Sequence, residues 1–258
     1  MKESILKGNS SGKRDNLEVT LSCVTFLIIW QVLAVFINSD IYLPTIGQTL
    51  SSLEEIVMQD RFYLDIVFSV GRSLLSFILA LIVALVLGVT SYSFRFIRNF
   101  FKPVNTLAQS IPNMILIVLA LIWFDKDSAS FIVGFMIVFP ILYDNILGAL
   151  IGIDKSILEM VSVYKVNQKD KIIKIYLPSI KFRLLPVLIS VFSLAFKIVI
   201  AGEVYGQPSY GIGTMIQVEK MNFNTSGIFA WLIIILIITM ILEVIKKLVL
   251  RRSFLWKR

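Results

Sequence analysis

Runs of about twenty apolar residues, repeated along the chain, constrain its fold more than any other feature. A helix needs about that many residues to cross a hydrocarbon core roughly 30 Å thick. Backbone groups inside a bilayer find no water, so each crossing run must be helical. We therefore predict an all-α membrane protein with six transmembrane helices. The runs occupy residues 19–37, 66–89, 103–124, 130–150, 184–205 and 227–250.

Composition supports the membrane assignment over a soluble domain with a large core. The chain is 57% hydrophobic and 16% charged, beyond the apolar share of ordinary soluble proteins. It has no histidine and one cysteine, Cys23, so it offers neither an internal disulfide nor an ordinary zinc or haem site. No clustered carboxylates or catalytic nucleophile stand out. We expect no cofactor and no enzymatic activity.

The distribution of lysine and arginine predicts the orientation. Of the 25 basic residues, 20 lie in the two terminal segments, in the loop after the second span and in the segment after the fourth. Basic residues near spans stay cytoplasmic. We therefore expect the chain to lie in a plasma membrane with both termini in the cytosol. This orientation explains the net charge of +8 without a nucleic-acid partner. We divide the chain into cytosolic tails at 1–18 and 251–258 and a transmembrane region at 19–250.

A polar, lysine-rich segment interrupts the second half of the chain between spans four and five, at residues 154–183. Apolar residues at helical spacing predict two short helices on either side of Asn167, which we expect to cap the second. Pro178 is expected to end the second helix. Two amphipathic helices between spans suit docking to a partner in the cytosol.

Charged residues within spans are costly and mark a second place of interest. Lys197 lies midway along the fifth span, where a charge costs about 2.5–3.5 kcal/mol. We expect it to face a translocation path or to pair with an acid, with snorkelling as the alternative. Arg72 is nearer a span end, and snorkelling is expected there. Residues Ala80, Ala84 and Gly88 share one face of the second span, which suits close packing within the chain or against a second copy.

Residues 202–213 carry Glu203, four glycines and a proline, a composition that forces irregular backbone. Such backbone is tolerated at membrane depth only when protein buries it or when it lines water. A simple external turn is the alternative. We expect Lys197, Glu203, Gly211 and Gly213 to contribute to a path or gate.

The polar segment resembles the "EAA…G…LP" loop in membrane subunits of bacterial ABC importers. Glu159 matches the leading glutamate, and Leu177 and Pro178 match the end of the motif. Met160 and Val161 replace the two alanines, and Lys165 replaces the glycine. The resemblance implies that this segment is a coupling helix whose Glu159, Lys165, Leu177 and Pro178 engage a cytosolic ATPase.

Further sequence motifs are similar to those of the nitrate, sulfonate and taurine group of these permeases. It includes the run from Glu203 to Gly213, with Lys197 ahead of it, and Leu43-Pro44 before a short surface helix. The resemblance implies two permease copies in a homodimer, two ATPases and an external substrate-binding protein. It also implies a small organic anion such as a sulfonate, or a vitamin precursor, as the solute. A secondary carrier or channel without an ATPase remains the alternative.

Overall fold

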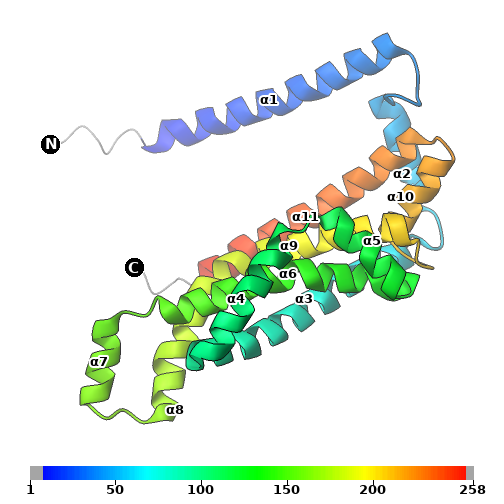
Figure 1. Ribbon diagram of the computed structural model, residues 1–258. Coiled ribbons are helices and arrows are strands. Elements are labelled where there is room, and N and C mark those ends of the chain that lie inside the picture. The colour runs from blue at the N-terminus through cyan, green and yellow to red at the C-terminus, as the bar shows by residue number, and fades with distance from the viewer. Residues whose placement is uncertain (1–7, 254–258) are drawn as a thin grey trace. The chain divides into compact units, whose positions relative to one another are not determined.

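A computed structural model describes residues 8–253, and within them the backbone forms only helices, turns and loops (Figure 1). Five helical stretches are long and apolar enough to cross a membrane, and a bent pair makes a sixth if it counts as one span. This confirms the all-α membrane fold. The chain divides into two compact units, 1–59 with 219–233 and 60–218 with 234–258, which are described separately.

The first unit joins the amino-terminal helix to a short amphipathic one. Helix α1 (Gly8–Ile37) begins well before the predicted span at residue 19, so part of the predicted tail is helical. Helix α2 (Ile46–Val57) confirms the predicted surface helix, and Thr45 and Gln48 close a capping box at its start. The Trp30 indole donates to the Pro44 carbonyl at 3.0 Å, which fixes the turn between the two helices.

The second unit is built around three long helices, α3 (Phe62–Ser93), α6 (Lys126–Ile151) and α9 (Leu177–Gly206), which pack against one another. The packed face of α3 carries small side chains, including Ala80, Ala84 and Gly88, that let α6 approach closely. A methyl group on Gly88 would lie 2.7 Å from Ile146 of α6. The expectation of packing within the chain is therefore confirmed.

The third predicted span is broken rather than straight. Helix α4 (Arg95–Ser110) starts inside the predicted loop and meets α5 (Asn113–Trp123) at an angle of 102°. Pro112 lies at the break, where its ring prevents a continuous hydrogen-bond ladder. Pro140, by contrast, lies inside an unbroken α6.

One further segment differs from the sequence prediction. The stretch expected as a loop up to Ser226 contains α10 (Ile212–Met221), because Ile212, Met215 and Glu219 bury one helical face after the glycine-rich turn. Helix α11 (Thr225–Ser253) follows and supplies the last apolar span.

Pro178 does not end a helix, contrary to the prediction. Helix α8 (Gln168–Lys171), a π-helical turn η1 (Ile172–Tyr176) and α9 form one continuous stretch from residue 168 to 206. Proline is tolerated in a first helical turn, and the wider π turn before it shifts the bonding so that the Leu177 amide donates to the Ile172 carbonyl.

Candidate functional site

The predicted site residues lie at the two ends of the second unit. Residues Glu203, Gly211 and Gly213 meet beside the first turns of α3, whereas Glu159, Lys165, Leu177 and Pro178 lie on or next to α7 (Lys155–Val163) and the α8–α9 stretch. Figure 1 shows α7 and α8 beyond one end of the α3–α6–α9 bundle. Lys197 belongs to neither group.

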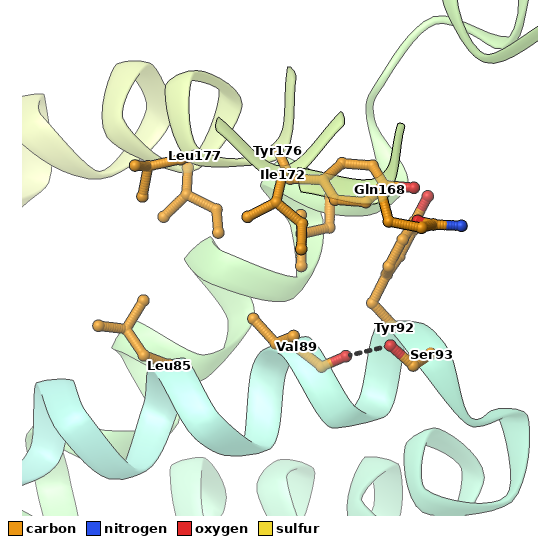
Figure 2. A pocket seen from close by; sticks show the side chains of 10 residues that line it. Leu85, Val89, Tyr92, Ser93, Gln168, Ile172, Tyr176 and Leu177 are labelled. Carbon is orange, nitrogen blue, oxygen red and sulfur yellow. Dashed lines mark hydrogen bonds between the residues drawn. The ribbon is translucent and has the colours of Figure 1, made fainter. Parts of the chain in front are cut away.

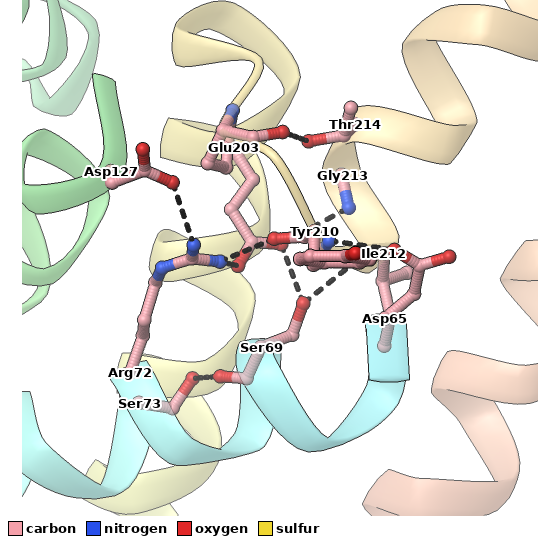
Figure 3. A network of polar contacts seen from close by, with 12 residues as sticks. Asp65, Ser69, Arg72, Ser73, Asp127, Glu203, Tyr210, Ile212, Gly213 and Thr214 are labelled. Atoms are coloured by element: carbon pink, nitrogen blue, oxygen red, sulfur yellow. Dashed lines mark hydrogen bonds and ion pairs between the residues drawn. The ribbon is translucent and has the colours of Figure 1, made fainter. Parts of the chain in front are cut away.

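A buried carboxylate organises the first group (Figure 3). Glu203 of α9 is fully buried and accepts hydrogen bonds from Arg72 at 2.9 Å, from the Ser69 hydroxyl at 2.6 Å and from the Gly213 amide at 3.1 Å. Each carboxylate oxygen therefore has a donor. A buried charge is tolerated only when it is paired and hydrogen-bonded in this way.

Arg72 does not snorkel, contrary to the prediction. Its side chain is only 10% exposed and forms ion pairs with Glu203 and, at 3.2 Å, with Asp127. The same guanidinium donates to the Tyr210 carbonyl at 2.6 Å. The signal for this pairing was present in the sequence as an arginine and a glutamate near the same end of two spans.

The glycine-rich turn lies directly on this carboxylate. The Gly211 amide donates to Asp65 at 2.9 Å, and the Ile212 amide donates to the Ser69 hydroxyl at 2.8 Å. A Cβ atom on Gly211 would fall 2.7 Å from the Glu203 carboxyl group, so this close approach requires glycine. The segment from Ser209 to Gly213 is thereby tied to α3, α6 and α9.

Lys197 lies apart from this network, with its side chain exposed at an otherwise largely buried stretch of α9. Its neighbours Phe196 and Ile198 are buried, and Glu203 points elsewhere, as the six-residue separation predicts. Among the described residues no acidic group lies within ion-pair distance of Lys197. The expected pairing with an acid within the chain is absent from that part of the structure.

The second group begins with a capped helix. The Asp154 carboxylate accepts from the Ser156 backbone amide at 2.9 Å, and these hydrogen bonds hold the pKa of Asp154 below its usual range. Leu158 and Val161 of α7 face the core of the unit. Glu159 is exposed on the same helix, and its carbonyl accepts the Ser162 hydroxyl.

Lys165 ends α7 in a left-handed conformation, with φ of 49°. The Lys165 amide bonds to the Ser162 carbonyl and the Val166 amide to the Val161 carbonyl, each at 3.2 Å. This pair of bonds is a Schellman motif, which normally places glycine at the left-handed position. Lysine thus occupies a glycine-type conformation at the position where the motif has glycine.

Helix α7 presents exposed apolar side chains on the side that faces away from the core. Met160 is 53% exposed and Val163 is 76% exposed. Asn167 caps α8, as predicted, by accepting from the Lys169 amide. Arg183, missed by the sequence analysis, donates to the Gly148 carbonyl at 3.1 Å, and its guanidinium fills the space that a side chain on Gly148 would need.

These apolar helices define a multi-pass membrane protein with an exposed helical segment between two of its spans. The chain belongs to the family described as binding-protein-dependent transport system inner membrane component, which matches residues 61–254. It is therefore the ABC permease component of a binding-protein-dependent transporter. The family comprises membrane components of transporters and not enzymes.

Two relatives cover nearly the whole chain. A protein of Methanocaldococcus jannaschii, provisionally named an ABC transporter permease, is 25% identical over 94% of this chain and 92% of its own length. A protein of Bacillus subtilis, provisionally named an aliphatic sulfonates transport permease, is 22% identical over 90% of this chain and 84% of its own length.

Proposed function

We propose that this chain is the permease subunit of an ABC importer and that it couples to a separate cytosolic ATPase through residues 154–183. The observation that carries the proposal is the apolar surface of α7, where Met160, Val163 and Tyr164 are exposed beyond the end of the bundle. An apolar patch of this kind marks an interaction site. The docking face is this outer one, because Leu158 and Val161 pack inward.

Coupling requires that the docked helix transmit movement to the spans. The continuous stretch from residue 168 to 206 provides a direct mechanical link, since α8 and the fifth span form one rod. ATP-driven closure of two ATPases would move this rod and switch the path between outward-facing and inward-facing states. Contacts of the segment must then differ between the two states.

The solute path is proposed to run past the exposed Lys197 side chain of α9, between two copies of the chain. A mid-span cation that faces neither an acid nor the core of its own unit suits a path for a small organic anion. The sulfonate assignment of one relative agrees with that class. An external binding protein would deliver the solute, and both termini would lie in the cytosol.

The Arg72–Glu203 pair and the broken α4–α5 span are features that a secondary carrier also uses. Here the pair is saturated by Ser69, Gly213 and the Tyr210 carbonyl, which suits an anchor for the outer turn better than an ion-coupling site. Family membership favours the ABC mechanism.

Glu159 tests the coupling role, because it is exposed and holds no core contact. We expect Glu159→Lys to abolish uptake of a labelled short alkanesulfonate while leaving the amount of folded chain in the membrane unchanged. Ser156→Lys, exposed on the same helix, is the matched control. Unchanged uptake by Glu159→Lys would count against the coupling role.

A further inference from the structure

A cavity of about 750 Å³ lies between the last turns of α3 and the α8–α9 stretch (Figure 2). It belongs to no part of the proposed transport path and is separate from the exposed face of α7. Figure 2 shows side chains of the two helices pointing toward each other across the gap. Its lining comprises Leu85, Val89, Tyr92, Ser93, Leu150, Gln168, Ile172, Tyr176, Leu177 and Ile180.

The helical register makes one wall of the cavity a continuous stripe. Residues Gln168, Ile172, Tyr176 and Ile180 recur every four positions along the α8–α9 stretch. The π turn widens the helix there, so that the consecutive residues Tyr176 and Leu177 both reach the cavity. Such π turns are frequent at functional sites.

The walls are apolar and the polar groups gather at one end. The rings of Tyr92 and Tyr176 meet edge to face with their centres 5.5 Å apart. Gln168 is the first residue of the stripe and also lines the cavity. The Lys171 ammonium lies 5.6 Å from the centre of the Tyr176 ring. The cavity therefore combines an apolar chamber with an adjoining cation.

Lys171 is available for an anionic ligand. The neighbouring Asp170 carboxylate pairs with Lys174 at 3.2 Å, and among the described residues no carboxylate lies within ion-pair distance of Lys171. Lysines recur along the segment, so the local charge is positive. Basic residues beside a bilayer attract anionic headgroups, and tyrosines favour the interface between hydrocarbon and water.

We propose that this cavity holds one acyl chain of an anionic phospholipid, with the lipid phosphate at Lys171. The volume lies within the range of pockets that enclose small ligands, roughly 300–1,000 Å³. The surrounding bilayer supplies acyl chains at high concentration, and burying their methylene groups against apolar walls is favourable. The lipid would fill the space between α3 and the coupling segment.

The test compares lipids retained by the purified full-length chain in mild detergent, measured by native mass spectrometry. Phosphatidylglycerol and phosphatidylcholine with identical acyl chains are supplied in equal amounts. We expect the wild type to retain one phosphatidylglycerol per chain, at least fivefold in preference to phosphatidylcholine. Soluble glycerol 3-phosphate at millimolar concentration should not displace it.

Two variants separate the acyl chain from the headgroup. Val89→Trp, at a partly exposed position on the cavity wall, should fill the chamber and lower retention of both lipids about tenfold. Lys171→Gln should abolish the preference for phosphatidylglycerol, whereas Lys181→Gln, exposed on the same segment, should keep it. Leu85→Trp serves as a second filling variant, and the thermal midpoint shows that each variant is folded.

Three results would overturn the proposal. The first is equal retention of the two lipids by the wild type. The second is wild-type retention by both folded filling variants, which would place the lipid elsewhere. The third is displacement by glycerol 3-phosphate, which would identify a site for soluble phosphates instead of lipid.

Discussion

At the scale of single residues, two unusual features decide local structure. A non-glycine residue, Lys165, adopts a left-handed conformation at the end of α7, and an ion pair between Arg72 and Glu203 is buried between α3 and α9. The first costs conformational energy, and the second costs desolvation that several hydrogen bonds offset. Both lie in the segments to which function is assigned, where strain is commonly found.

We expect Lys165→Gly to stabilise the turn after α7. A left-handed non-glycine residue costs roughly 1–2 kcal/mol, and the greater freedom of glycine in the unfolded chain removes about 0.5–1 kcal/mol of that gain. The net stabilisation is about 0.5–1 kcal/mol, seen as slower hydrogen exchange of the Lys165 and Val166 amide region. Lys169→Gly, inside α8, should speed local exchange instead. Faster exchange in both variants would contradict the left-handed turn.

Removing one partner of the buried pair should be far more damaging than removing an unpaired charge. Arg72→Met leaves the Glu203 carboxylate buried without its cation, at a cost of about 3–5 kcal/mol. The double variant Arg72→Met/Glu203→Met should recover part of that loss. Lys197→Met removes an unpaired cation from mid-span, where a charge is itself costly, so it should not lower stability.

Thermal unfolding in detergent, followed by tryptophan fluorescence, measures these differences. Equal midpoints for Arg72→Met and Lys197→Met would show that the ion pair contributes nothing to the fold.

At the scale of helices, the sequence predicts those features that depend on the length of apolar runs and on the spacing of small residues. The long apolar helices, the surface helix at α2 and the close packing of Ala80, Ala84 and Gly88 follow from those patterns. Proline was harder to interpret, because its effect depends on the bonding before it. Pro112 lies at a 102° break, whereas the π turn accommodates Pro178 within a continuous helix.

The polar network can be predicted from the sequence only in part. Asp65, Ser69 and Arg72 come from α3, Asp127 from α6 and Glu203 from α9, so their meeting depends on helix register in three dimensions. Arg72 and Glu203 stand out in the sequence as charged residues in or beside spans, but the sequence does not show which partners they meet. Glu203, Gly211 and Gly213, three of the residues predicted to contribute to a path or gate, do lie together.

The contact between α3 and α6 predicts a strong size limit at Gly88. Gly88→Leu would place its first side-chain atom 2.7 Å from Ile146, and overpacking of this kind costs typically 1–3 kcal/mol. Val86→Leu, on the exposed face of the same helix, should change stability by less than about 0.5 kcal/mol. Equal thermal midpoints for the two variants would contradict the packing of α3 on α6.

At the scale of the whole molecule, the chain combines a bundle of spans with a helical segment that presents apolar side chains beyond the bundle's end. That segment buries few of its own side chains, so packing within the segment does not explain its exposed apolar side chains. The proposed docking of another transporter subunit would explain such a surface, and membership in a family of permease components agrees with it. The central proposal is that α7 docks against a separate ATPase subunit.

The most direct test is an affinity pull-down of the tagged full-length chain from its own membranes in mild detergent. Three forms are compared: the wild type, a double variant Met160→Glu/Val163→Glu on the exposed face of α7, and Ser156→Glu, which adds charge at a polar exposed position on the same helix. We predict that an ABC ATPase copurifies with the wild type and Ser156→Glu and is lost from the double variant. An ATPase absent from all three, or retained equally by the double variant, would contradict the account.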